Sequence, residues 1–157
     1  MTDTVAVSRE IAAPAELVWG MVSDVTRMGE WSPENEGGSW MGESKSAERG
    51  AKFKAANRYG KRSWKTVSTV VAAEPGRLFS FRVSAGPFKV AEWSYDFEPT
   101  ATGCRVTESW TDLRNGLFRP IAQMATGVKD RAAHNRKGME QTLENLAQAA
   151  ESVADTS

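Results

Sequence analysis

The sequence predicts an α+β domain in which about six to seven antiparallel strands curl around a long C-terminal helix. Residues 117–153 carry an apolar stripe at the helical period, with charged and amide side chains on the opposite side. Almost everything before this segment alternates as short strands separated by glycine- and proline-containing turns. One helix of that length can cover one curved sheet, so the 157 residues suit a single domain, structured from about residue 4 to 150.

The N-terminal part is expected to add one strand and two short helices. Alternation over Thr4–Ile11 predicts the first strand. Pro14 and Glu16 suit the first turn of a helix, and apolar residues within 17–25 form its buried face. A second, short helical turn is expected over Met28–Pro33, where the proline ends it.

The middle of the chain alternates as strand after strand. A weak, glycine-bent edge strand is expected first, and five regular strands follow: 39–43, then 52–59, 63–73, 79–84, 92–97 and 104–111. Short turns such as Glu74-Pro75-Gly76 separate them. Successive hairpins of this kind give an antiparallel meander with one buried face.

Composition excludes several classes of function. Twenty acidic and twenty basic residues cancel, so nothing favours nucleic acid or an anionic membrane as a general partner. No apolar run approaches the ~20 residues of a membrane span, so stable membrane insertion is not expected. A polar N-terminus and a single cysteine, Cys104, favour the cytoplasm. With His134 as the only histidine, neither a zinc site nor a Ser-His-Asp triad is expected, and no cofactor is implied.

Three segments carry a resemblance to a known family. They are IAAPAELVWGMVSDVTRMGEWSP, WKTVSTVVAAEPGRLFSFRV and the long final helix. Together they resemble the START-like (helix-grip, Bet v 1-like) superfamily, and within it the polyketide cyclase/dehydrase and lipid transport subgroup. The matching positions are Pro14, Val18, Trp19, Asp24, Trp31, Pro33, Trp64, Val70, Pro75 and Phe81. The resemblance covers residues from about 4 to 148 and implies a helix-grip fold, with a deep cavity between the sheet and the C-terminal helix.

In that fold the inward strand faces and the apolar stripe would line the cavity. The expected ligand-binding residues are Phe53, Asn57, Trp64, Ser68, Phe81, Trp93, Trp110, Met124, Val128 and Asn135. A mostly apolar pocket with a few polar groups suits a small, flat, lipophilic ligand. The alternative is that the aromatic side chains simply fill the core. Asn135 interrupts the stripe, so either a ligand or the sheet backbone must satisfy its amide.

Glu108 is the sharpest candidate for catalysis. It lies two residues from both Val106 and Trp110 on the same strand, so it should point inward with them. Loss of hydration there raises the pKa of a carboxyl group. It could then act as a general acid or base, with Tyr95 polarising a carbonyl. The alternative is a Glu108 at the rim, paired with Arg or Lys. His134 lies off the stripe and is expected at the solvated surface, and Asp24 is expected to cap a turn.

Three functions remain open at this point. The first is binding of a hydrophobic small molecule, such as a polyketide, lipid or sterol-like compound. The second is a polyketide cyclase or dehydratase that uses Glu108 and Tyr95. The third is a protein-interaction module, which has less support because no exposed apolar patch can be recognised in the sequence. Either a monomer or a homodimer fits, because fold and composition do not decide function or assembly.

Overall fold

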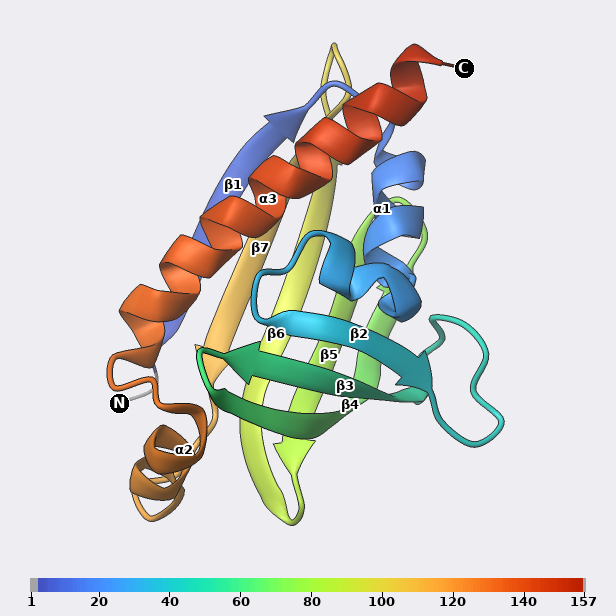
Figure 1. Ribbon diagram of the computed structural model, residues 1–157. Helices are drawn as coiled ribbons and strands as arrows, with labels where there is room; N and C mark the ends of the chain where they lie inside the picture. The colour runs from blue at the N-terminus through green and yellow to red at the C-terminus, as the bar shows by residue number, and fades with distance from the viewer. Residues whose placement is uncertain (1–2, 157) are drawn as a thin grey trace.

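Seven strands form one antiparallel sheet in the computed structural model, which describes residues 3–156 (Figure 1). In chain order the strands are β1 (Thr4–Ile11), β2 (Asn35–Trp40), β3 (Lys52–Tyr59), β4 (Arg62–Glu74), β5 (Leu78–Ala85), β6 (Phe88–Pro99) and β7 (Cys104–Asp112). The helices are α1 (Ala15–Ser23), the short 3-10 helix η1 (Val25–Glu30), α2 (Phe118–Thr126) and α3 (Arg131–Asp155). The strand order is β1-β7-β6-β5-β4-β3-β2, so the α+β class and the predicted meander are confirmed.

The sheet curves around α3, which crosses its concave side beside β1 (Figure 1). Register shifts at Asn35/Gly37, Val70/Ala72 and Val83/Ser84 place irregularities in the strand pairs β2–β3, β4–β5 and β5–β6. Such bulges bend a strand and increase its twist, which accounts for the curvature. The helix and the sheet together form the helix-grip arrangement that the resemblance implied.

The main core fills only one end of the space between the sheet and α3. Leu143, Leu146 and Ala150 of α3 are buried there against strand residues such as Phe79 and Val106. The apolar face of α1 closes the same end with Val18, Met21 and Val22. Asp24 caps η1 by accepting a hydrogen bond from the Thr26 amide at 3.1 Å, as expected for this position.

The C-terminal segment is two helices, so the prediction of one continuous helix over 117–153 is wrong. Gly127 ends α2 in the left-handed conformation, with φ of 75°, which glycine adopts without a steric penalty. Asp130 then begins α3 by accepting a hydrogen bond from the Ala133 amide at 3.1 Å. The amphipathic period continues across the connection, so the apolar stripe by itself did not reveal the break.

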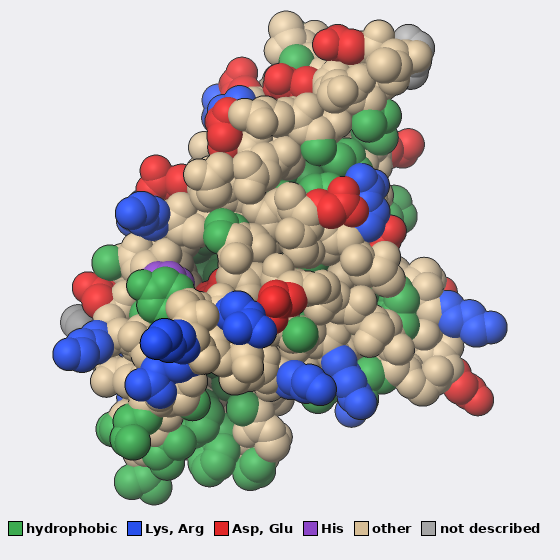
Figure 2. Space-filling model, viewed as in Figure 1, with side chains coloured by type: hydrophobic (Ala, Val, Ile, Leu, Met, Phe, Trp, Pro, Cys, Tyr) green, Lys and Arg blue, Asp and Glu red, His purple; other side chains and the backbone are tan. Residues whose placement is uncertain are grey.

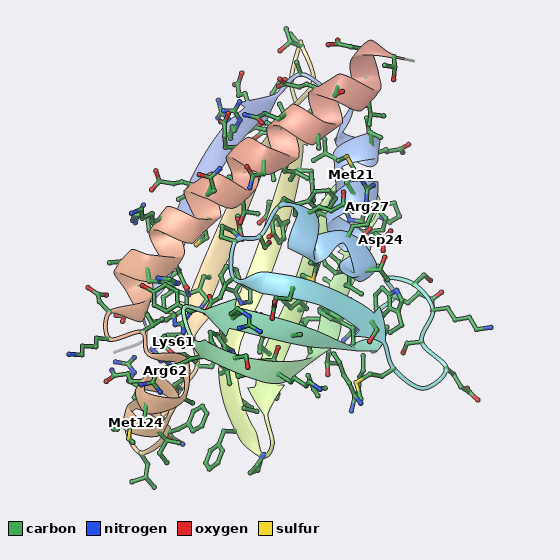
Figure 3. All side chains as sticks on the ribbon, viewed as in Figure 1. Met21, Asp24, Arg27, Lys61, Arg62 and Met124 are labelled. Carbon is green, nitrogen blue, oxygen red and sulfur yellow. The ribbon has the colours of Figure 1, made fainter. Side chains whose placement is uncertain are left out.

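Two polar contacts hold α2 against the sheet. Asp112, at the end of β7, forms ion pairs with Arg114 and with Arg119 of α2, both at 2.9 Å. Arg62 of β4 donates a hydrogen bond to the carbonyl oxygen of Met124 at 2.6 Å, near the C-terminal end of α2. The short helix therefore has a fixed position beside the ends of β4 and β7 (Figure 3).

The edge strand lies four residues earlier than expected, at Asn35–Trp40 instead of 39–43. Its glycines allow β2 to approach η1 closely. A Cβ atom at Gly38 would lie 2.7 Å from the carbonyl oxygen of Val25 and 3.2 Å from that of Lys54. Both obstacles are backbone atoms, so a side chain there would push η1 away from the sheet.

We expect Gly38→Ala to destabilise the protein because the added methyl group overlaps fixed backbone. Overpacking of this kind typically costs about 1–3 kcal/mol in the free energy of unfolding. Urea denaturation measures the change. Gly116→Ala is the matched control, since a Cβ at Gly116 has no neighbour within 4 Å. Equal stability of the two variants would contradict the close approach of β2 to η1.

Candidate functional site

A cavity of about 520 Å³ lies between the curved sheet and the N-terminal half of α3. Strands β3 to β7 supply most of its wall, and the remainder comes from α2, α3, the segment from the end of η1 to the start of β2, and Arg114 after β7. Aromatic and aliphatic side chains dominate the strand wall, as expected for a small-molecule site.

The structure brings most of the sequence-predicted residues to this cavity. Those on its wall are Phe53, Asn57, Trp64, Ser68, Phe81, Trp93, Tyr95, Glu108, Trp110 and Asn135. Their register follows from strand alternation, since β6 and β7 pair Tyr95 with Glu108 and Trp93 with Trp110. Whether each of them contacts a ligand stays a prediction.

Met124 and Val128 do not border the cavity, which corrects the expectation for both. The turn at Gly127 changes the direction of the chain, so the two residues no longer share the inner face of α3. Met124 is 75% exposed on α2, and Val128 is buried within the connection between the helices. Ala122 and Thr126 of α2 border the cavity in their place.

Glu108 is buried at the wall of the cavity and is paired with Tyr95. It is only 2% exposed, and its Oε2 accepts a hydrogen bond from the Tyr95 hydroxyl at 2.8 Å. Its other carboxyl oxygen, Oε1, has no hydrogen-bond partner among the described residues. No Lys or Arg of residues 3–156 forms an ion pair with it, so the alternative of a rim carboxylate paired with a cation does not hold.

Burial without a cation keeps the proton on Glu108. Loss of hydration raises the pKa of this carboxyl group from 4.5 to about 8, and the hydrogen bond from Tyr95 offsets only part of that rise. Burial and the neighbouring Glu108 also raise the pKa of Tyr95 well above its ordinary value of 10. Both side chains are therefore protonated at neutral pH. With the Tyr95 proton directed to Oε2, the carboxyl group retains a second hydrogen-bonding position at Oε1.

A second polar cluster borders the cavity where its wall is partly exposed. Arg131 of α3 donates to both carboxylate oxygens of Glu34 at 3.0 Å, and to Oδ1 of Asn135 at 3.4 Å. The guanidinium of Arg131 also lies over the ring of Trp64, 5.9 Å from its centroid. The Asn135 side chain is thus partly satisfied by a neighbour on its own helix, an alternative that sequence reasoning did not consider.

His134 belongs to this cluster, so the expectation of a solvated surface residue is wrong. Its Nε2 lies 3.7 Å from Glu34, and its ring packs edge-on against Tyr59 with centroids 4.6 Å apart. Burial lowers the pKa of His134 below 6.5, aided by the positive charge of Arg131 and opposed by Glu34. The ring is therefore mostly neutral at neutral pH.

Sequence reasoning missed Glu34, Arg131 and His134 as cavity residues. Glu34 and Arg131 lie 97 positions apart, and neither stands in a recognisable motif. Only the fold, which carries the start of α3 over the segment before β2, places them together. No group of three His, Cys, Asp or Glu side chains with metal-binding geometry occurs in the described part of the chain.

Residues 2–151 match the family model described as polyketide cyclase/dehydrase and lipid transport. The chain belongs to this family. A search of proteins with curated functions found none that matches the sequence.

Solved structures add one relative of higher sequence identity and two distant proteins of the same fold. A Polyketide_cyc-like protein from Corynebacterium glutamicum, Cgl2372, is 33% identical, with a TM-score of 0.66 over 96% of this chain and 93% of that one. The di-domain ARO/CYC StfQ of the steffimycin biosynthetic pathway is 15% identical, with a TM-score of 0.76 over 99% of this chain, which spans 52% of StfQ. A major latex-like protein from Panax ginseng is 12% identical, with a TM-score of 0.72 over 96% of this chain and 98% of that one. At this low sequence identity, the likeness to StfQ and to the ginseng protein shows only a shared fold.

The buried carboxyl group predicts an unusual dependence of stability on pH. The folded-state pKa of Glu108 is about 8, above the ordinary 4.5 of an unfolded chain, so folding favours the protonated form. The contribution of this protonated form to the free energy of unfolding is fully present below pH 4.5. It is lost progressively as pH rises to about 8. We expect Glu108→Gln, which is uncharged at every pH, to gain stability relative to the wild type over this range, reaching a few kcal/mol at pH 8.

Urea unfolding at several pH values between these limits measures the difference. Glu43→Gln makes the same chemical change at an exposed loop position and should retain the wild-type pH dependence. If Glu108→Gln and the wild type keep parallel stability profiles, Glu108 is ionised in the folded protein and the assignment of its proton fails.

Proposed function

We propose that this protein binds a small, flat, mostly apolar molecule that carries a carbonyl or hydroxyl oxygen. The observation that carries the proposal is the cavity of about 520 Å³, in which an apolar wall surrounds one buried, protonated carboxyl group. An apolar molecule gains free energy by leaving water for this wall. An oxygen on the same molecule would supply the partner that Glu108 Oε1 lacks.

The aromatic residues favour a flat ligand. Trp93 and Trp110 are cross-strand partners, and Phe53 and Phe81 pack edge-on with centroids 5.2 Å apart, so flat side chains line neighbouring strands. A planar ring system could stack on or against them. The Glu34–Arg131–His134 cluster supplies donors and acceptors at the more exposed part of the wall, where a polar end of the ligand would remain near water.

The family's description as polyketide cyclase/dehydrase, together with the likeness to StfQ, the di-domain ARO/CYC of the steffimycin biosynthetic pathway, supports polyketides as one class of ligand to test. Family membership alone leaves open lipids and other hydrophobic molecules, because the same fold serves several functions. The cavity chemistry is the narrower argument, since it requires both a flat apolar body and an oxygen.

Filling part of the cavity should weaken ligand binding. Gly138 borders the cavity on α3, and a Cβ there would meet nothing within 4 Å, so Gly138→Leu can project into the space without disturbing the helix. We expect this variant to bind hydroxyanthraquinone at least about tenfold more weakly than the wild type, as measured by quenching of tryptophan fluorescence.

Gly20→Leu is the matched control, because Gly20 lies on α1, has equally open surroundings and does not border the cavity. It should bind like the wild type. Circular dichroism would verify that both variants fold. Equal affinity of the two variants, or absence of saturable binding by the wild type, would refute the proposal.

A second candidate function is a cyclase or dehydratase reaction, and the protonated Glu108 favours it. A carboxylic acid with a pKa of about 8 can donate its proton to a ligand carbonyl oxygen while an enol carbon of the same ligand attacks that carbonyl carbon, and the Glu108 carboxylate then takes the proton that the enol hydroxyl releases. The new carbon–carbon bond forms as the carbon–oxygen double bond opens, and the proton completes the resulting hydroxyl group. Loss of water from that product would complete a dehydration.

This second reading predicts that Glu108→Gln removes turnover and preserves binding. The amide keeps the shape of the carboxyl group but cannot transfer the proton, so we expect a fall in rate of roughly 10²-fold or more with hydroxyanthraquinone affinity nearly unchanged. Conversion of a synthetic poly-β-ketone, followed by liquid chromatography, measures the rate. Wild-type turnover should also decline above about pH 8, where Glu108 loses its proton. Full activity of Glu108→Gln would exclude Glu108 as the acid.

A further inference from the structure

Apolar side chains gather on one projecting end of the molecule. Leu117, Ile121 and Met124 are 83%, 57% and 75% exposed, and all three belong to α2 or to the residue before it. Phe118 of α2 stacks on Phe88 of the β5–β6 hairpin, with ring centroids 4.7 Å apart and planes within 6°. We call these five residues the apolar tip. Figure 2 shows hydrophobic side chains concentrated at the lower end of the molecule, where Figure 1 places α2 and the hairpin.

The apolar side chains of α2 are exposed where a surface helix would normally bury them. Its small residues Ala122 and Thr126 are buried and border the cavity, whereas Ile121 and Met124 point to solvent. A short surface helix usually buries its large apolar residues and exposes its polar ones. An exposed apolar face of this kind marks an interaction site.

Positive charge surrounds the apolar tip, although the whole chain is neutral. Arg62 donates to the Met124 carbonyl, Lys61 precedes it, Lys89 follows Phe88, and Lys129 follows the C-terminal end of α2. Figure 3 shows Lys61 and Arg62 beside Met124, and Figure 2 shows basic side chains directly above the apolar ones. Segment 113–129 contains no acidic residue. Within residues 3–156, no ion pair neutralises Lys61, Lys89 or Lys129.

We propose that the apolar tip and its surrounding cations dock this protein on the surface of an anionic lipid bilayer. Leucine, isoleucine, methionine and phenylalanine side chains would enter the boundary between headgroups and acyl chains, as in interfacial amphipathic helices. The lysine and arginine side chains would stay at headgroup level beside lipid phosphates, extending their aliphatic stems along the apolar surface. This is peripheral binding, since no helix of the described residues is both long and apolar enough to cross a membrane.

The shape of the apolar tip favours a bilayer over a second protein. A helix and a hairpin end project from one end of the molecule, so the surface there is convex (Figure 1). A convex projection meets little area on a rigid, flat partner, whereas stable protein interfaces bury about 800 Å² on each side. A fluid bilayer can close around each side chain separately.

Docking would also bring the cavity close to the membrane. Because α2 borders the cavity with one face and carries the apolar tip on the other, it would separate the ligand site from the lipid by the thickness of one helix. The docking proposal rests on the exposed side chains of the apolar tip and on the positive charges around it. It holds whether or not the cavity binds the ligand class proposed above.

Co-sedimentation with vesicles tests the proposal. The wild type should bind vesicles that contain roughly 30% phosphatidylglycerol in phosphatidylcholine, bind pure phosphatidylcholine more weakly, and dissociate as salt rises. The triple variant L117S/I121S/M124S should lose at least about tenfold in vesicle affinity, because it removes most of the exposed apolar area. Lys61→Glu should weaken binding to anionic vesicles several-fold and leave binding to neutral vesicles nearly unchanged.

Val153→Ser and Lys45→Glu are matched controls that change an exposed valine and an exposed lysine away from the apolar tip. Both should bind vesicles like the wild type. Circular dichroism would verify that the triple variant folds, and unchanged hydroxyanthraquinone binding would separate its loss of vesicle affinity from the ligand proposal.

Two results would overturn membrane docking. One is wild-type protein that stays in the supernatant with anionic vesicles, or a triple variant that binds them as the wild type does. The other is a wild-type dimer in analytical ultracentrifugation that the triple variant converts to monomer, with no vesicle binding by either, which would assign the apolar tip to a second copy of the chain.

Discussion

A seven-stranded curved sheet offers a concave face that one helix cannot seal, and the functional features of this protein depend on that mismatch. The C-terminal half of α3 completes a packed core with Leu143, Leu146 and Ala150 over one end of the sheet. Over the other end, the N-terminal half of α3 contributes one large apolar side chain to the core, Met139, which belongs to the same buried cluster as Trp110. Gly138 leaves open space where a side chain could stand, and the cavity of about 520 Å³ remains. Interiors are normally close-packed, so a space of this size is a feature that the fold maintains against the tendency to collapse.

The cavity in turn determines the electrostatics of Glu108. A carboxyl group held among aromatic side chains, with only the Tyr95 hydroxyl as partner, cannot ionise without losing most of its hydration. It therefore remains a neutral acid at neutral pH. Arg131 illustrates the contrast, because it stands at the more exposed part of the same cavity and is paired with Glu34. The same cavity thus contains one buried carboxyl group without a cationic partner and, nearer to water, one carboxylate that is paired with an arginine.

The candidate site could be predicted from sequence where it depends on strand alternation. Trp64, Ser68, Tyr95, Glu108 and Trp110 lie on the wall because side chains alternate strictly along each strand, and that period is visible in the residues themselves. The prediction failed where it relied on helical continuity. Met124 belonged to the apolar stripe, but the left-handed turn at Gly127 separates α2 from α3 and leaves Met124 exposed. His134 failed for the opposite reason, since a position off the stripe was covered by Tyr59 and Glu34 from distant segments.

The sequence by itself determined the class of fold, the number and order of the strands, and the inward direction of Glu108. Each of these follows from local periodicity and turn residues, which act over a few positions of the chain. Only the tertiary structure decided that Glu34, Arg131 and His134 meet at the cavity, and that a neutral chain has one basic, apolar end. These features depend on contacts between residues as many as 97 positions apart. No local pattern encodes such contacts, because they arise from how the curved sheet places its ends and the helices that follow them.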